Sequence, residues 1–455
     1  MLCSRGYAIA LSGLTDTELN TLKRQLTVQP EVDDKYKVGI LEYKVFTISF
    51  NYIYIPRHFI PHDFQNVPNN FKDPVPIHLT FEGSLKSSTH QPEAVEAVLH
   101  GLRTKGSGIL SLPTGYGKTT VALYILCEMK VKTLIVVHKE FLMTQWYERI
   151  QQFIPNARVG RIQANVVDVD DKDIVIGMLQ SLSSKDYDRK HFRGFGLTII
   201  DETHHVCTRT FSKLFSKVNT RHILGLSATL ERKDGLTKVL HWFLGDVLFK
   251  VERKTQKQVC VECVPFSCSQ YDTFPINRAR QPNIPEAINM LTTIPERNEL
   301  IMITIHRKLE QNRRVLVLTD RRQHCKDLLE MFMTAYGTTH TGGLYIGGMK
   351  PDDLKKSEEA SVIFATFSLA YEGLDIPVLD TLILATPKSD IVQSVGRILR
   401  ETKGKQNDPC VVDIIDQWGP FKYQFFKRSK YYKATGFCIQ RDQPEDVVNG
   451  YLFVE

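Results

Sequence analysis

Short apolar runs and longer stretches with helical spacing alternate along the middle of the chain. Most of the runs are four or five residues long, are rich in Val, Ile and Leu, and end in a polar or glycine-containing turn. Runs of this kind are typical of strands that are buried on both faces, as in parallel sheets covered by helices. The first series of predicted strands comprises residues 109–112, 133–137, 173–176, 197–200 and 222–226.

A second series of the same kind follows further along the chain. Strands that alternate with helices form α/β folds built on parallel sheets, so the two series predict two α/β lobes in tandem. The predicted strands of the second series comprise residues 314–318, 361–365, 381–385 and 410–415.

The segments outside these two lobes have a different pattern. Residues 1–80 combine a helical patch at 15–26 with β-rich runs at 43–50 and 52–56, which predicts a small α+β domain. Residues 253–290 lose the alternation and carry four prolines, which is typical of a linker with some strand content. We therefore expect an N-terminal accessory domain (1–80), a first lobe (81–252), a linker (253–290) and a second lobe (291–455).

The charge of the chain is mildly positive. Lys and Arg number 58 against 51 Asp and Glu, which gives a formal net charge of +7. Residues 1–80 and 401–455 each carry eight basic and eight acidic side chains, so the whole excess lies between them. Such a bias permits a polyanionic partner without identifying one. No run of eighteen apolar residues occurs and the first residues do not resemble a secretory signal, so we expect no membrane association.

The nine cysteines are an odd number at irregular spacing, which indicates free thiols in a reducing, intracellular compartment. Cys260 and Cys263 have the spacing of a zinc-binding pair. No second pair of cysteines and no pair of histidines accompanies them, and the run 258–265 is rich in Val. We expect a strand at this place rather than a zinc site.

The sharpest chemical signal is a glycine-rich turn between the predicted strand 109–112 and the apolar helical stretch 121–126. The backbone N–H groups of such a turn, together with the positive end of the helix dipole, can bind phosphates. Lys118 would reach the β- and γ-phosphates of a nucleotide, and the Thr119 hydroxyl would bind Mg²⁺. Leu112 stands where the full GxxxxGK[ST] pattern has its first glycine. The residues expected to bind the nucleotide here are Thr114, Gly115, Tyr116, Gly117, Lys118, Thr119 and Thr120.

Two adjacent carboxylates, Asp201 and Glu202, directly follow the predicted strand 197–200. Such a pair suits metal-assisted phosphate hydrolysis, because one carboxylate can hold Mg²⁺ while the other orients or deprotonates the attacking water. We assign the metal to Asp201, together with Thr119, and the water to Glu202. The alternative, a solvated acidic turn, is disfavoured by the phosphate-binding pattern upstream.

With these two signals in order, the chain resembles the superfamily 2 helicases and translocases in their DExH variant. The stretches 227–229, 365–377 and 393–400 match further motifs of that superfamily, and Arg232-Lys-Asp-Gly235 is similar to the branch of the XPB-type and UvsW-type DNA helicases. The stretch 52–59, together with residues 370–377, is similar to compact helicases of large DNA viruses, including the poxvirus transcript-release type. The resemblance implies two RecA-like lobes, each a parallel sheet flanked by helices.

The resemblance also implies catalytic and nucleotide-binding roles in the second lobe. Arg397 and Arg400 would be the arginine fingers that stabilise the transferring γ-phosphoryl group, because a planar, always protonated donor suits charge spread over several oxygens. Gly373 and Asp375 would lie at the same nucleotide, with Asp375 near the ribose.

Four residues would couple hydrolysis to movement of the lobes by the same resemblance: His204, Ser227, Thr229 and Gln393. Ser394 replaces the first Arg of the common sixth motif, QRxGRxxR, so one contact of that motif is absent. Gln91 lies before the phosphate-binding turn, where related proteins place a Gln that reads the adenine edge. We expect Gln91 to contact the adenine, although Ser87 to His90 replace the Arg or aromatic residue that usually precedes it.

Further residues are implied to lie on the faces that grip one strand of nucleic acid. Backbone amides, hydroxyls and cations at such faces contact phosphates without reading sequence. Trp146 and Met178 lie in the same segments and fit the hydrophobic core equally well. The residues expected to contact nucleic acid are His138, Lys139, Gln180, Arg321 and Thr366.

Two further segments stand apart from these motifs. Residues 421–433 contain five cations, six aromatic residues and no acid, a mixture that can stack on bases and bind phosphates. On a helix, Phe421, Phe425 and Tyr432 share roughly one face and would dock the helix on the second lobe; the two roles are compatible. The glycine-rich stretch 342–348 has no Lys-Thr after it and is predicted to be a loop.

These expectations combine into an ATP- and Mg²⁺-dependent nucleic-acid helicase or translocase. The resemblance favours a DNA helicase of 3′-to-5′ polarity that acts on a single strand or a fork in viral transcription, replication or repair, with transcription or repair proteins as candidate partners. An RNA helicase and a double-strand DNA remodelling translocase remain alternatives. If the protein is viral, we expect it in the host cytoplasm or nucleus and in the virion. The N-terminal domain resembles no catalytic domain and is predicted to position the substrate or to cap the lobe.

Overall fold

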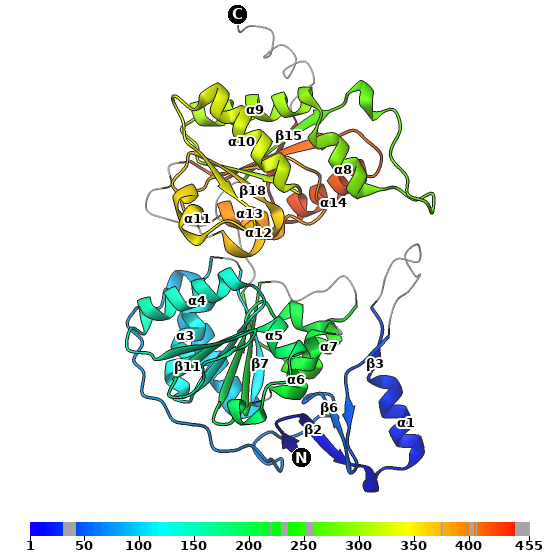
Figure 1. Cartoon of the computed structure of the whole chain (residues 1–455), viewed down its shortest axis with the longest axis vertical. Helices are drawn as coiled ribbons and strands as arrows, with labels where there is room; N and C mark the ends of the chain where they lie inside the picture. Colours follow the sequence, from blue (N-terminus) through cyan, green and yellow to red (C-terminus); the bar gives the residue numbers. More distant parts are fainter. Residues whose placement is uncertain are drawn as a thin grey trace, which may run out of the picture. The chain divides into compact units, whose positions relative to one another are not determined.

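The computed structural model describes residues 1–30, 42–113, 115–208, 210–218, 220–228, 235–251, 259–374, 376–399, 405 and 407–441. The chain divides into two compact units, Met1–Arg253 and Lys254–Glu455. Each unit contains a parallel sheet with helices on both faces (Figure 1), so the predicted α/β fold with two RecA-like lobes is confirmed.

The large sheet of unit 1 is parallel except for the antiparallel edge pair β10–β9. Its strands, from one edge to the other, are β10 (Val166–Val167), β9 (Val159–Gln163), β11 (Ile174–Met178), β8 (Thr133–Val137), β12 (Leu197–Ile200), β13 (His222–Ser227), β7 (Ser107–Ser111) and β14 (Val247–Lys250).

Alternate side chains of these strands enter two separate hydrophobic cores. Leu134 and Val136 of β8 belong to one core, whereas Ile135 and Val137 belong to the other, as the period of two along a strand requires. One face is covered by α2 (Gln91–Lys105), α3 (Lys118–Met129) and α4 (Glu140–Phe153). The other is covered by α5 (Leu179–Ser184), α6 (Leu214–Lys217), α7 (Thr237–Leu244) and the N-terminal segment.

The N-terminal segment packs on this second face and shares its core. Arg57, which is 1% exposed, donates to the backbone carbonyls of Thr220 and Arg221 in the lobe, and His58 lies within hydrogen-bonding distance of Ser107. The elements of the segment are β1 (Leu2–Cys3), β2 (Gly6–Ala10), α1 (Asp16–Gln25), β3 (Thr27–Val28), β4 (Tyr43–Lys44), β5 (Thr47–Ile48) and β6 (Tyr52–Ile55).

The sheet of unit 2 is parallel throughout its described strands. The strands, in spatial order, are β17 (Gly342–Tyr345), β18 (Val362–Thr366), β16 (Val315–Thr319), β19 (Thr381–Leu384), β20 (Cys410–Asp416), β15 (Cys260–Phe266) and β21 (Cys438–Arg441).

Helices cover both faces of this sheet as well. One core contains side chains of α9 (Pro295–Glu310) and α10 (Arg322–Tyr336), and α8 (Ile284–Thr292) packs beside it with Tyr271 and Trp418. The other face is covered by α11 (Pro351–Glu358), α12 (Phe367–Gly373), α13 (Val392–Ile398) and α14 (Phe421–Ala434). Two buried ion pairs on β20 fix the helices: Arg297 of α9 with Asp416, and Arg428 of α14 with Asp413.

Every strand predicted for the two lobes is present, with ends shifted by two residues or fewer. The prediction of a loop at residues 342–348 was wrong at its start, because Gly342–Tyr345 forms the edge strand β17. The strand expected around Cys260 is β15, and Cys260 and Cys263 point to opposite faces because they lie three residues apart on a strand. That geometry does not suit one shared zinc ion.

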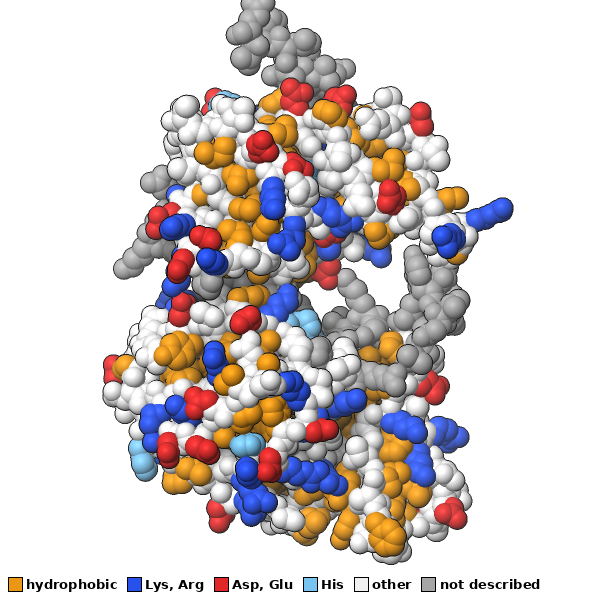
Figure 2. Space-filling view, in the orientation of Figure 1, with side chains coloured by type: hydrophobic (Ala, Val, Ile, Leu, Met, Phe, Trp, Pro, Cys, Tyr) orange, Lys and Arg blue, Asp and Glu red, His pale blue; other side chains and the backbone are white. Residues whose placement is uncertain are grey.

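On the face drawn in Figure 2, Lys and Arg side chains are interspersed with Asp and Glu side chains over both units. This face therefore does not gather the net positive charge into a single large patch. Among the described helices, none has the length and apolar character needed to cross a bilayer.

Candidate functional site

The predicted phosphate-binding turn and the predicted acidic pair lie at the same edge of the unit 1 sheet. β13 pairs with β7 on one side and with β12 on the other, and all three strands run in the same direction. Their carboxyl ends lead to the turn after Ser111, to Ser227 itself and to Asp201. In parallel α/β sheets, ligands bind outside the carboxyl ends of the strands. The topology therefore brings together residues that are far apart in the sequence.

The turn after β7 has the backbone conformation that phosphate binding requires. Gly115 and Gly117 have φ values of 88° and 79°, in the left-handed region that glycine adopts without strain. α3 begins at Lys118, so its first N–H groups have no partner within the helix and are available to a ligand. The Lys118 ammonium donates to the Leu112 carbonyl at 3.3 Å, a long bond that a phosphate oxygen can replace. Thr114 lies outside the described residues.

Gln91 is fixed directly against this turn. Its side-chain amide donates to the carbonyl of Tyr116 at 3.0 Å and accepts from the backbone N–H of Lys86 at 2.9 Å. A Cβ atom at Gly117 would lie 2.4 Å from the Gln91 amide nitrogen, so no larger residue fits at Gly117 while Gln91 keeps this position. A side-chain amide has two donors and two acceptor sites, and these bonds use one of each. These two bonds therefore leave one donor and one acceptor site of the Gln91 amide that a ligand could use.

Asp201 is held by two hydrogen bonds at the end of β12. The indole N–H of Trp146 donates to one carboxylate oxygen at 2.9 Å, and the backbone N–H of Glu202 donates to the other at 3.0 Å. Burial, followed by the nearby charge of Glu202, raises the pKa of Asp201, while the Trp146 hydrogen bond and the Lys118 ammonium oppose this shift. Trp146 is 2% exposed, so it is a core residue that also orients the proposed metal ligand.

Glu202 adopts an uncommon backbone conformation, with φ 47° and ψ 59°. A non-glycine residue in the left-handed region costs about 1–3 kcal/mol and is kept where the surroundings determine it, often at functional sites. The Glu202 carboxylate lies 3.4 Å from the Nδ1 atom of His204, and both side chains are about one-fifth exposed, at 19% and 23%. An uncommon backbone conformation just after β12 marks Glu202 as a candidate functional residue.

Three histidines connect the acidic pair to residues expected to contact nucleic acid. The ring centroids of His204 and His205 are 4.3 Å apart, and those of His205 and His138 are 3.9 Å apart. Gln180 donates to the carbonyl of His138. The structure therefore brings together His138, Gln180 and His204. His205 is the link that sequence reasoning missed, although the two adjacent histidines were a visible signal.

The other residues predicted in unit 1 lie near this site or at its border. Ser227 is fully buried, and its carbonyl accepts from the N–H of Leu112, which ties the end of β13 to the start of the turn. Lys139 directly precedes α4, and its ammonium lies 6.0 Å from the Phe141 ring centroid. Thr119 and Thr120 lie in the first turn of α3. Thr229 lies outside the described residues.

Among the site residues predicted in unit 2, Arg397 forms hydrogen bonds within that unit. Arg397 of α13 is 7% exposed and donates to the carbonyls of Leu374, at 2.7 Å, and Tyr371. Gln393, also on α13, is partly buried. Gly373 ends α12. Asp375 and Arg400 lie outside the described residues.

Arg321 and Thr366 have partners inside unit 2. The Arg321 guanidinium donates to the side chain of Asn289 at 2.7 Å and to the carbonyl of Pro285 at 2.8 Å, which directs it to α8. Thr366, at the end of β18, is 5% exposed and accepts a hydrogen bond from Ser368 at 3.4 Å.

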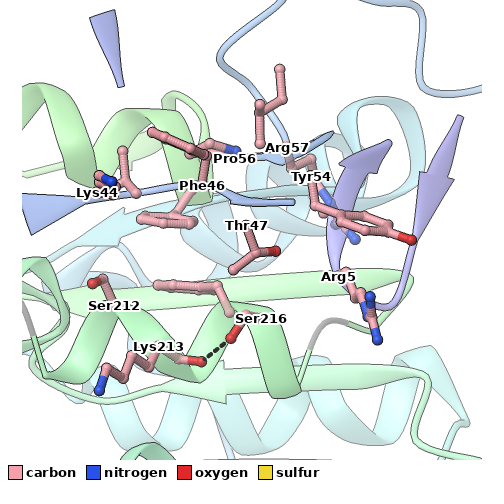
Figure 3. Close-up of a pocket in the computed structure, with 15 residues that line it drawn as sticks. Arg5, Lys44, Phe46, Thr47, Tyr54, Pro56, Arg57, Ser212, Lys213 and Ser216 are labelled. Carbon is pink, nitrogen blue, oxygen red and sulfur yellow. Dashed lines mark hydrogen bonds between the residues drawn. The ribbon is translucent and has the colours of Figure 1, made fainter. Parts of the chain in front are cut away.

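A cavity of about 70 Å³ lies elsewhere, between the N-terminal segment and the lobe of unit 1 (Figure 3). Phe46, Tyr54 and Phe215 contribute apolar surface, and Arg5 and Lys213 border it. The lysine and arginine side chains in Figure 3 point away from one another rather than toward a common centre. No residue of the phosphate-binding turn lines this cavity, so it is separate from the site described above.

This chain is similar to known proteins over most of its length. The profile of one family, described as type III restriction enzyme, res subunit, matches residues 84–232. A protein of Acanthamoeba polyphaga mimivirus, named as a candidate ATP-dependent RNA helicase, is 34% identical over 449 residues, which cover 96% of this chain and 85% of that protein. An African swine fever virus protein with the same kind of name is 25% identical over 453 residues, covering 92% of this chain and 86% of that protein.

Among solved structures, a DEAD-box helicase bound to single-stranded RNA has a TM-score of 0.57 with this chain at 14% identity. The match covers 80% of this chain and 77% of that one. At this identity the likeness shows a shared fold.

Proposed function

Because this chain belongs to the superfamily 2 helicases of large DNA viruses, as the mimivirus relative shows, we propose that it is a nucleic-acid motor driven by ATP hydrolysis. The observation that carries the proposal is the sheet order β12–β13–β7 in unit 1. This order places Asp201 and Glu202 one strand away from the turn that ends in Lys118. A phosphate-binding turn and two carboxylates at the carboxyl ends of strands in one parallel sheet form the minimal apparatus for nucleotide hydrolysis.

Lys118 and the turn before it bind the phosphates of ATP. The left-handed conformation of Gly115 and Gly117 and the start of α3 present backbone N–H donors to an anion. The Lys118 ammonium then exchanges its hydrogen bond to the Leu112 carbonyl for one to a phosphate oxygen. Gln91 positions the turn through Tyr116, and its remaining donor and acceptor sites serve adenine recognition. The same turn therefore links base recognition to phosphate binding.

Thr119 and Asp201 fit the demands of a magnesium site. Mg²⁺ is usually bound through one or two protein ligands together with phosphates and waters, so no larger ligand cluster is needed. Asp201 is oriented by the Trp146 indole and offers its carboxylate oxygens. When bound, Mg²⁺ neutralises charge on the phosphates.

Glu202 orients the attacking water and accepts its proton. Its carboxylate oxygen lies next to His204, whose ring contacts His205 and through it His138. A change in the Glu202 carboxylate on hydrolysis is therefore transmitted to the segment that carries His138 and Gln180. This row of rings, together with Ser227 at the end of β13, is the proposed coupling element of unit 1. The sequence resemblance gives the same role to Thr229 and Gln393.

Arg397 and Arg400 remain the proposed donors to the transferring γ-phosphoryl group. The guanidinium of Arg397 already donates to the carbonyls of Leu374 and Tyr371. Arg397 is therefore suited to hold the segment that ends α12, and Arg400 is the stronger candidate for the γ-phosphate.

The proposed substrate is DNA, with movement in the 3′-to-5′ direction. The sequence resemblance to XPB-type and UvsW-type helicases supports this choice. RNA is the alternative, and it is supported by the names of the two viral relatives. A double-strand DNA translocase that does not separate strands is the third reading.

One assay separates these readings. ATP hydrolysis by the full chain is measured with single-stranded DNA, duplex DNA and RNA in parallel, each over a range of salt concentrations. We expect the strongest stimulation with single-stranded DNA, and unwinding of duplexes with a 3′ tail but not of those with a 5′ tail. Stronger stimulation by RNA would make the protein an RNA helicase, and stimulation by duplex alone would make it a translocase. Hydrolysis that no nucleic acid stimulates would overturn the proposal.

A further inference from the structure

We propose that the exposed face of α14 is an additional nucleic-acid-binding surface, which holds a single strand through lysine–phosphate contacts and through stacking of bases on Tyr423 and Phe426. It rests on the proposed function in one respect, because the ligand is the nucleic acid on which the motor acts. α14 follows the last motif of the helicase family and includes none of its motif residues.

The inner face of α14 is firmly docked on unit 2. Arg428, which is 1% exposed, donates to both carboxylate oxygens of Asp413 on β20, each at 2.8 Å. Tyr432, which is fully buried, donates to the same carboxylate at 2.9 Å, and Arg428 also donates to the carbonyl of Lys388 at 2.6 Å. Phe421 is buried at the start of the helix. A bidentate Arg–Asp pair has a defined geometry, so it fixes the rotation of the helix about its axis.

The outer face is consequently determined as well. At 100° per residue the exposed positions span an arc of about 140° on one side of the helix. Tyr423 is 76% exposed and Phe426 is 63% exposed, although large aromatic side chains usually bury much of their surface. The exposed lysines and aromatic residues of this face are Lys422, Tyr423, Phe426, Lys427, Lys430 and Lys433.

The charge of this face is uncompensated within the described part of the chain. α14 contains no acidic residue, and none of its four lysines forms an ion pair with a described carboxylate. The Lys430 ammonium lies 5.5 Å from the centroid of the Phe426 ring, so a cation and a stacking surface are presented together. Such a face attracts a polyanion that also has flat, apolar groups.

Single-stranded nucleic acid matches both features. Its phosphates bind lysines with release of counterions, and its unpaired bases stack on aromatic rings without regard to sequence. A membrane surface would also attract the lysines, but membrane-binding helices carry a continuous apolar face of Leu, Phe or Trp. Here the two exposed rings lie among lysines, and the remaining aromatic residues of the helix face inward or are partly buried. The geometry therefore favours nucleic acid.

The test compares two α14 variants of the full chain with wild type in binding a fluorescent oligothymidylate over a range of salt concentrations. In Lys427→Gln/Lys430→Gln, two phosphate contacts are removed, so the slope of log affinity against log salt should become shallower by about 1.4. In Tyr423→Ala/Phe426→Ala, each lost base stack should weaken binding by about 5-fold to about 150-fold. All four side chains are exposed, and the thermal unfolding midpoint checks that the fold is retained.

The matched control is Lys355→Gln/Lys356→Gln on α11, which removes the same charge from an exposed helix that also carries acidic residues. We expect the control to bind within about twofold of wild type. Wild-type affinity and salt slope in both α14 variants would overturn this inference while leaving the proposed function intact. Absence of binding and of ATPase stimulation in the wild-type protein would instead overturn the proposed function. Loss of binding to phosphatidylserine vesicles, with oligonucleotide binding unchanged, would assign the face to membranes.

Discussion

At the scale of single residues, Trp146 shows how a core side chain can also serve chemistry. The sequence leaves two readings open for it, core or nucleic-acid face. The structure places its ring in the core of unit 1 and its N–H at the carboxylate of Asp201. Residues that hydrogen-bond a metal ligand set its orientation, and their loss typically lowers metal affinity or activity by 10- to 100-fold.

Trp146→Phe tests this role, because Phe retains most of the ring and removes the donor. We expect a turnover of ATP about 10- to 100-fold lower, with a raised Mg²⁺ requirement, measured by steady-state hydrolysis over a magnesium titration. Trp242→Phe is the control, because the Trp242 ring packs edge-on against Phe59 and belongs to the other hydrophobic core of unit 1. Equal activity of Trp146→Phe and wild type would show that the indole N–H is not needed.

Other side-chain contacts in the site also could not be predicted from single sequence positions. The pairing of Gln91 with Tyr116 and the row formed by His138, His205 and His204 depend on side chains that meet only after the strands have assembled. Family resemblance indicated Gln91, His138 and His204 as candidate site residues. It could not show which of them touch, because contacts across strand ends depend on sheet order.

At the scale of elements, the central strands could be predicted from the sequence because they are buried on both faces. β8 and β12, for example, have the bounds expected from their apolar runs. The strands that were not predicted lie at or near sheet edges, where one side is solvated and the pattern is weaker. β9 and β17 contain glycines, and β17 begins with two, which resemble a loop when read alone. Their strand form comes from pairing with β11 and β18.

His324 ties three elements of unit 2 together. Its Nδ1 atom lies 2.8 Å from the Thr319 hydroxyl at the end of β16, and its Nε2 atom lies 2.9 Å from the side-chain oxygen of Asn298 on α9, while His324 itself is on α10. Burial, with a smaller contribution from the Arg297 charge, lowers the pKa of His324 to about 3. In the unfolded chain the pKa returns to about 6.5.

This difference predicts how acid affects unit 2. Below pH 6.5 the His324 imidazole is protonated in the unfolded state, whereas in the folded state it stays neutral until pH falls to about 3. The contribution of His324 to stability is therefore complete above pH 6.5 and decreases as pH falls, by about 1.4 kcal/mol per pH unit at most. His324→Gln removes this proton uptake. Its unfolding free energy should depend less on pH between 6 and 5 than that of wild type.

Native-state hydrogen exchange of the β16 amides, corrected for intrinsic rates, measures this effect. His306→Gln on α9 is the control, because the imidazole of His306 is 41% exposed. An unchanged pH dependence in His324→Gln would show that His324 is protonated as readily in the folded state as in the unfolded one.

At the scale of the whole molecule, the charge of +7 turned out to be a weak guide. Lys and Arg are interspersed with acids over the face seen in Figure 2. The four lysines of α14, by contrast, lie within residues 401–455, a part of the sequence with no net charge. Function was indicated instead by ordered motifs, and the parallel sheet of unit 1 brings the phosphate-binding turn and the acidic pair to the carboxyl ends of its strands. The sequence left open whether the N-terminal domain positions the substrate or caps the lobe, because its packing on the lobe depends on contacts such as Arg57 with Thr220 and Arg221.

Unit 1 contains the proposed hydrolytic site of a motor, with Glu202 as the residue that activates water. Glu202→Gln keeps the shape of the side chain and removes its basicity. The decisive measurement is single-turnover ATP hydrolysis, with saturating single-stranded DNA, by wild type, Glu202→Gln and the exposed control Glu330→Gln, alongside ATP binding by each. We predict that Glu202→Gln binds ATP normally and hydrolyses it about 10²- to 10⁴-fold more slowly, the usual loss for a missing general base, while the control resembles wild type. Hydrolysis by Glu202→Gln at the wild-type rate would contradict the account.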